Sequence, residues 1–86
     1  MADTKYLINV DFPEVSRVHL NPDKYDIDSR CRTRPKNPDV GGSLLVTEEE
    51  ASRYLRHESM LTFHNKPVKN LQKCKLCSIK SEYHLP

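Results

Sequence analysis

Two of the three cysteines form the motif Cys74-Lys-Leu-Cys77, and Cys31 is the third. A Cys-x-x-Cys turn directs two thiolates at one centre, and Zn²⁺ prefers four tetrahedral nitrogen and sulfur ligands. Since the chain holds only three thiols, the fourth ligand of such a site would be a histidine. The available imidazoles are His19, His57, His64 and His84. Residue types and spacing therefore predict a zinc site with three cysteine ligands and one histidine ligand.

Two alternatives exist for Cys74 and Cys77, namely a thioredoxin-like redox pair and a pair of inert buried thiols. The redox motif follows a strand and begins a helix within a βαβ unit, and the sequence predicts no such unit before Cys74. A disulfide scaffold is disfavoured because the cysteine count is odd. The first residues, Met-Ala-Asp-Thr-Lys-Tyr, lack the pattern of a signal peptide. We therefore expect a cytoplasmic protein with reduced thiols.

The chain has 86 residues, of which 36% are hydrophobic and none is tryptophan. This length fits a single domain over residues 1–86 and excludes a Rossmann sheet, a TIM barrel or a kinase. Ordering such a chain costs roughly 1.5 kcal/mol per residue, so a small core leaves little margin and a structural metal is a common addition. No segment approaches the ~18 consecutive apolar residues of a membrane span, and we expect no membrane partner.

The first half of the chain predicts three short strands. Residues 5–10 are β-prone, and residues 16–20 alternate polar and apolar side chains. With a turn at residues 12–14, these two segments predict an N-terminal β-hairpin. Two prolines and a Gly-Gly pair predict an exposed loop at about residues 32–42. Residues 43–46 then predict a short third strand.

The clearest helix signal follows, at about residues 47–57. Thr47 and Glu50 have the spacing of a capping box, and Ala51 and Leu55 belong to one apolar stripe. The acidic residues in the first turn suit the positive end of the helix dipole. The sequence therefore predicts one helix directly after the third strand.

The remainder of the chain gives weaker signals. Residues 60–63 predict another short strand or an apolar loop, and Pro67 excludes a continuous helix from there to Cys74. The polar tail at residues 78–86 is expected to fray. The predicted fold class is α+β, a small zinc-stabilised domain with an N-terminal β-hairpin, a short strand, one helix and a Cys-x-x-Cys turn.

The order of these pieces resembles the N-terminal zinc-binding domain of the Ada DNA-repair proteins, and short stand-alone bacterial and phage proteins with the same layout. The segments that carry the resemblance span most of the chain. They are Arg17-Val-His-Leu20, Cys31, Leu44-Leu-Val-Thr-Glu-Glu-Glu-Ala51 and Gln72-Lys-Cys-Lys-Leu-Cys77. The last two segments are the specific ones.

The resemblance implies that Cys31, Cys74 and Cys77 are zinc ligands and that His19 takes the place of the family's first ligand cysteine. His64 stays open as the alternative fourth ligand, because two connecting segments are longer here than in the family. In the Ada proteins the first ligand cysteine accepts a methyl group from damaged DNA phosphates. An imidazole is no thiolate nucleophile, so we do not expect alkyl transfer by this chain.

Positive charges gather around the predicted site and form candidate contacts to phosphates or to a partner. These residues are Arg30, Arg32, Arg34, Lys36, Lys73 and Lys75. The first four alternate along the chain, so an extended backbone would place them on one side. The formal net charge is only +2, however, and no aromatic residues interleave with the arginines to stack bases.

The sequence contains no Ser-His-Asp arrangement, phosphate-binding loop or dinucleotide fingerprint, and a hydrolytic zinc site needs an open coordination position. We therefore expect no enzymatic activity. The predicted function is a non-catalytic, structural-zinc interaction module whose main partner is a protein, for example a phage or mobile-element factor that binds a host protein. The alternative is a module that binds the nucleic-acid backbone with an affinity that falls as salt rises.

Overall fold

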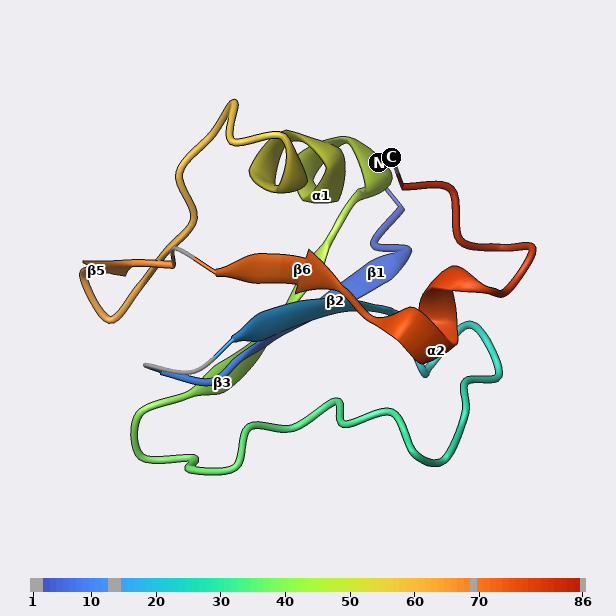
Figure 1. The fold of residues 1–86 in the computed structure, drawn as a ribbon, viewed down its shortest axis with the longest axis horizontal. Coiled ribbons are helices and arrows are strands. Elements are labelled where there is room, and N and C mark those ends of the chain that lie inside the picture. The colour runs from blue at the N-terminus through green and yellow to red at the C-terminus, as the bar shows by residue number, and fades with distance from the viewer. Residues whose placement is uncertain (1–2, 13–14, 69, 86) are drawn as a thin grey trace.

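The computed structural model describes residues 3–12, 15–68 and 70–85, so Pro13 and Glu14 of the predicted turn lie outside the described residues. The fold is α+β, as the sequence predicts, and Figure 1 shows one main sheet with helix α1 on one side. The elements follow the chain as β1 (Tyr6–Val10), β2 (Ser16–Leu20), β3 (Gly42–Val46), α1 (Glu48–Leu55), β4 (Thr62–Phe63), β5 (Lys66–Pro67), β6 (Leu71–Lys73) and α2 (Lys75–Ser78).

The main sheet has the strand order β3-β1-β2-β6. Strands β1 and β2 pair antiparallel with Ile8 opposite Val18, which confirms the predicted hairpin. Strand β3 pairs antiparallel with the other edge of β1, and β6 adds to β2 in parallel. Strands β4 and β5 form a separate two-stranded ribbon, so the predicted segment at residues 60–63 is a strand at Thr62–Phe63.

One face of the main sheet carries the hydrophobic core. Strand β1 places Tyr6, Ile8 and Val10 on this face, and all three are fully buried. Helix α1 covers the face and contributes the buried Ala51 to the same cluster (Figure 1). Because alternate residues of a strand point to opposite faces, His19 of β2 lies on the other face of the sheet.

The N-terminus of α1 is fixed by the predicted capping box. The Glu50 backbone N–H donates to Thr47 Oγ1 at 3.1 Å, and the Thr47 backbone N–H donates to the Glu50 carboxylate at 3.3 Å. The helix ends at Leu55, two residues earlier than predicted, because the chain reverses at His57, which has a positive φ of 60°. Within the part of the chain that the structure describes, no helix is long and apolar enough to cross a membrane.

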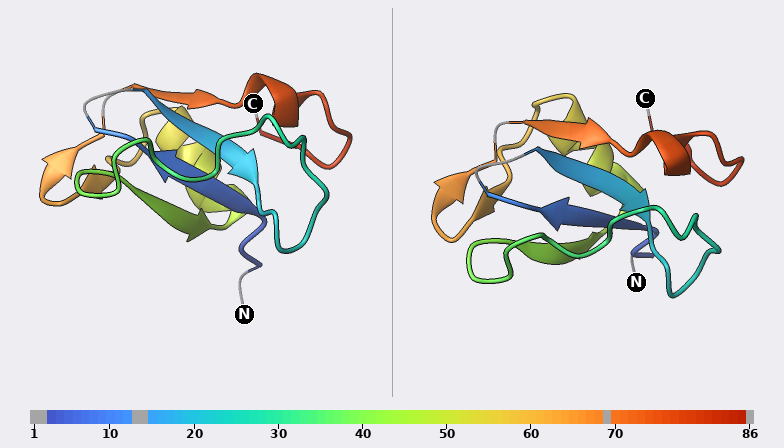
Figure 2. Two further views of the ribbon diagram at one scale, coloured as in Figure 1. Left: turned by 90° about the horizontal axis from the view of Figure 1, so that it is seen from below. Right: turned by 60° about the horizontal axis from the view of Figure 1, so that its bottom comes forward.

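The long segment between β2 and β3 crosses the sheet on the side opposite α1, as the view from below shows (Figure 2, left). Asn9 of β1 holds this segment, because its Nδ2 donates to the carbonyl oxygens of Arg32 at 2.9 Å and Arg34 at 3.3 Å. Near its end, a Cβ at Gly41 would clash with the backbone oxygen of Val10. The predicted loop is therefore a layer laid on the second face of the sheet, with most of its side chains exposed.

The C-terminal part differs from the sequence prediction in two respects. Strand β6 and helix α2 are not predicted, because three and four residues are too few to show a hydrophobic period. Strand β6 forms because β2 offers it an edge to pair with. The Cys-x-x-Cys motif therefore forms no simple turn, since Cys74 is the N-cap of α2 and Cys77 lies within that helix.

The tail that was expected to fray contributes to the core. Tyr83 and Leu85 are each only 9% exposed. The Tyr83 hydroxyl donates to the Val18 carbonyl oxygen at 2.8 Å, and the Tyr83 ring meets the Tyr6 ring edge-on at 5.3 Å. Tyr83 and Leu85 are large apolar residues in an otherwise polar segment, and they attach the tail to the core. Pro86 lies outside the described residues.

Candidate metal centre

Four side chains from separate parts of the chain converge at one end of the sheet. One ligand atom from each of His19, Cys31, Cys74 and Cys77 lies within 4.8 Å of the others. His19 comes from β2, Cys31 from the long loop, and the last two from the junction of β6 and α2. The centre therefore joins the loop to the sheet.

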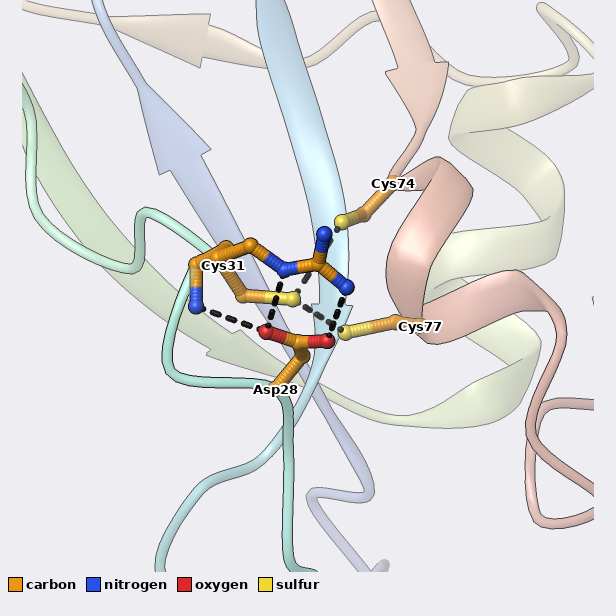
Figure 3. Close-up of polar contacts among 5 residues, drawn as sticks. Asp28, Cys31, Cys74 and Cys77 are labelled. Carbon is orange, nitrogen blue, oxygen red and sulfur yellow. Dashed lines mark hydrogen bonds and ion pairs between the residues drawn. The ribbon is translucent and has the colours of Figure 1, made fainter.

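The distances between these atoms suit a tetrahedral ion. Cys31 Sγ lies 3.6 Å from Cys74 Sγ and 3.4 Å from Cys77 Sγ, and the three thiols point toward one another (Figure 3). His19 Nδ1 lies 3.8 Å from Cys77 Sγ. Zinc bonds of about 2.3 Å to sulfur and about 2.0–2.1 Å to nitrogen place tetrahedral ligands about 3.5–3.8 Å apart. The arrangement can enclose such an ion with small adjustments.

Backbone hydrogen bonds place two of the three cysteines. The Cys74 N–H donates to the Val18 carbonyl oxygen at 3.1 Å, which continues the β2–β6 pairing up to the site. The Cys31 N–H donates to the Asp28 carbonyl oxygen at 2.9 Å. The same turn is closed by the Asp28 carboxylate, which accepts from the Arg30 backbone and guanidinium at 2.8–3.0 Å (Figure 3). These Arg30 hydrogen bonds lower the Asp28 pKa to about 2.

The protonation states of the ligands follow from burial. Desolvation lowers the pKa of His19 from 6.5 to about 4, and the charge of Arg17 acts in the same direction. His19 is therefore neutral near pH 7 and keeps a lone pair for a metal. Burial raises the pKa of the Cys31 and Cys77 thiols, so a nearby cation is needed to hold them as thiolates.

The groups beside the cysteine pair distinguish the centre from a redox site. Contrary to the sequence prediction, Cys74 does follow a strand and begin a helix, which is the local setting of a thioredoxin-like pair. The third thiol and the imidazole beside the pair complete a metal-ligand set instead.

The centre is largely closed. His19, Cys74 and Cys77 are 1%, 5% and 0% exposed, and Cys31 is half-buried. The other predicted fourth ligand, His64, lies at the exposed turn between β4 and β5 and is not part of the cluster. Four protein ligands that are mostly buried suit a structural ion.

The predicted basic contacts separate into two groups. Arg30, Arg32, Lys36 and Lys75 line a cavity of about 640 Å³ beside the metal centre. Arg34 and Lys73, although predicted with them, are not among the residues that line it. Arg17 does line the cavity and was missed. The sequence could have indicated Arg17, because it lies two residues before His19 in an alternating strand. This spacing places both side chains on one face of the sheet.

Searches against protein-family models, curated proteins and solved structures found no match to this chain.

Proposed function

We propose that the chain is a small zinc-binding module in which the ion is structural and the protein acts by binding rather than by catalysis. The convergence of one imidazole and three thiol groups within 4.8 Å is the observation that carries this proposal. Three sulfur ligands and one nitrogen ligand form a donor set typical of structural zinc. Hard cations such as Mg²⁺ and Ca²⁺ prefer oxygen ligands instead.

The position of the centre supports a structural role. His19 Nδ1 and the three sulfur atoms belong to a strand, a loop and a strand–helix junction. A bound zinc ion would supply a tetrahedral cross-link between these parts. Four protein ligands leave no coordination position for an activated water, which is what a hydrolytic zinc site requires. The zinc-binding domain that the sequence resembles is consistent with this role.

The three free cysteines suit a reducing compartment such as the cytoplasm, and a protein partner remains our preferred target. Nucleic-acid binding stays the alternative that the sequence raised. Proteins that follow a nucleic-acid backbone place cations along its path. Here most of the predicted cations converge on one cavity, while Arg34 and Lys73 lie outside it, which favours a compact ligand over a backbone track.

The test is metal stoichiometry in purified protein. We expect one zinc ion per chain by elemental analysis, and a tetrahedral cobalt spectrum with thiolate charge-transfer bands after cobalt substitution. Cys77→Ser should abolish stoichiometric binding, and His19→Ala should weaken it strongly. His64→Ala, an imidazole substitution outside the cluster, is the matched control and should bind normally. Metal-free wild-type protein that is fully folded would overturn the proposal.

A further inference from the structure

The cavity beside the metal centre extends well beyond the four proposed ligands. It measures about 640 Å³, is open to solvent, and is lined by residues of β1, β2, the loop around Arg32 and the start of α2. Cavities of 300–1,000 Å³ commonly hold small ligands or single side chains of a partner. His19, Cys31 and Cys74 form part of its wall, so a bound ion would fix the relative positions of its sides.

The wall of the cavity is strongly cationic. The positive residues that line it are Arg17, Arg30, Arg32, Lys36 and Lys75, and Asp11 is the only carboxylate among the described residues of the lining. Arg30 is engaged by the Asp28 carboxylate at 2.8 Å. Within the described residues, none of Arg17, Arg32 and Lys75 forms an ion pair with a carboxylate. Three cations from β2, the loop and α2 are thus available to an anion.

Two buried acceptors in the same lining add a second requirement. Asn9 is 6% exposed, and its Oδ1 has no hydrogen-bond partner among the described residues. Because its Nδ2 is held by two loop carbonyls, the amide cannot turn round to present a donor. Asp11 is also 6% exposed and accepts the Lys36 backbone N–H at 3.4 Å. A ligand with an N–H or O–H donor would satisfy these acceptors.

We propose that this cavity binds a phosphate monoester whose neighbouring atoms carry an ammonium or N–H donor. A phosphate monoester has a charge of about −1.5 to −2 near neutral pH, which suits three converging cations, and the donor would face Asn9 and Asp11. The inference rests on the proposed binding module and specifies the chemistry of its target. A phosphorylated peptide and a free phosphorylated amine share this chemistry. A phosphodiester backbone lacks the donor and carries one charge per phosphate.

The first test compares ligands on metal-loaded protein by calorimetry. O-Phosphoethanolamine and ethyl phosphate differ only in an ammonium group, so we expect the former to bind at least severalfold more tightly. Comparison of a phosphoserine peptide with O-phosphoethanolamine then distinguishes the two sources of the group by which of the two ligands binds more tightly. Preferential binding of a short DNA duplex over all of these ligands would overturn the inference, and so would no binding of either small phosphate.

Two cations that line the cavity, Arg32 and Lys75, each have a cation of the same type two residues away that does not line it, so matched variants can be compared. Arg32→Gln and Lys75→Gln should each weaken O-phosphoethanolamine binding by about tenfold, as expected for loss of a charged hydrogen bond. Arg34→Gln and Lys73→Gln remove the same charge two residues away on side chains outside the cavity, and should leave binding within about twofold. Equal losses in both sets would mean unspecific electrostatic attraction and would overturn the assignment.

Asp11→Asn tests the donor requirement. Removing this charge should strengthen ethyl phosphate binding and reduce the preference for the ammonium-bearing ligand, whereas an unchanged preference would contradict the role of Asp11. Metal content measured on the same samples keeps the two proposals separate. Protein that contains zinc but binds no phosphate monoester overturns this inference alone. Protein that binds the monoester but no metal overturns the structural-zinc proposal.

Discussion

At the scale of single residues, His19 is the side chain that links the sheet to the metal centre. It is 1% exposed on β2, and its Nδ1 faces the Cys77 thiol at 3.8 Å. Its Nε2 is buried without a hydrogen-bond partner among the described residues. The buried surroundings of both ring nitrogens favour a neutral imidazole over an imidazolium, because a buried charge without a partner is costly.

We predict that this residue makes the protein less stable in mild acid. The folded-state pKa of His19 is lowered from 6.5 to about 4, so between these values the unfolded chain binds a proton that the folded chain does not. Stability is therefore fully present above pH 6.5 and is lost as the pH falls toward 4. A metal on Nδ1 acts in the same direction.

The measurement is urea unfolding of the zinc-loaded protein across this pH range, together with NMR of the His19 ring. The unfolding free energy should fall with the pH, while the His19 ring resonances keep their neutral positions. Ring resonances that titrate near pH 6.5, the ordinary value for His19, would mean that neither burial nor a bound metal keeps the imidazole neutral.

Part of the candidate site could be predicted from residue types and their spacing. The spacing of Cys74 and Cys77 and the scarcity of other thiols were enough to propose the three cysteines, and the family resemblance selected His19. The choice between His19 and His64 depends on which imidazole faces the thiols across the sheet, and sequence spacing does not encode that. Arg17 was missed because its importance comes from the cavity beside it.

At the scale of elements, the start of helix α1 is determined by a local sequence feature, the capping box of Thr47 and Glu50. Thr47→Ala removes the side chain that accepts the Glu50 N–H at 3.1 Å. We expect a loss of about 1 kcal/mol in the free energy of unfolding, as is typical for an N-cap threonine. Thr62→Ala, at an exposed position of β4, is the control and should change stability by less than about 0.5 kcal/mol. Equal effects would contradict the role of the capping box.

The tail is a second element with a measurable contribution. Tyr83→Phe removes the hydroxyl that donates to the Val18 carbonyl at 2.8 Å but keeps the ring against Tyr6. Because Val18 still accepts the Cys74 N–H, the expected cost is about 1 kcal/mol in urea unfolding. Tyr54→Phe is the matched control, since the Tyr54 hydroxyl has no hydrogen bond within the described chain. A smaller effect of Tyr83→Phe than of this control would mean that the tail does not dock.

The elements that the sequence predicts are those with local signals. The β1–β2 hairpin follows from alternation, and α1 follows from its capping box. Strand β6 and the docked tail depend on partners more than 50 residues away in the chain, as in the pairing of Ser16 with Leu71 and of Val18 with Tyr83. Such contacts are set by tertiary packing rather than by local sequence. For the same reason the Cys-x-x-Cys motif was predicted as a turn and not as the start of a helix.

At the scale of the whole molecule, the two sides of the sheet are held by different forces. Helix α1 and the tail bury the core residues on one side (Figure 1). On the other side the long loop crosses the sheet (Figure 2) with few buried apolar side chains of its own. It is held by hydrogen bonds from Asn9 and by Cys31 at the metal centre. At the start of the loop Asn21 Nδ2 donates to the Thr4 carbonyl oxygen at 2.9 Å, and Tyr25 and Ile27 pack against the core. The metal centre would anchor the loop further along, at Cys31.

This asymmetry leads to the prediction that removal of the metal unfolds the protein. Zinc binding in small domains is worth on the order of 10–16 kcal/mol, while a whole domain is stable by only about 5–15 kcal/mol. Without the ion, Cys31 no longer holds the loop, and the buried thiols and His19 lose the cation that offsets their desolvation. We expect exhaustive chelation to collapse the amide NMR dispersion. Addition of zinc should restore it. The far-UV circular dichroism of the loaded protein should show mixed structure with a minority of helix. Dispersion that persists across the whole chain in protein shown to be metal-free would overturn the structural role proposed for the ion.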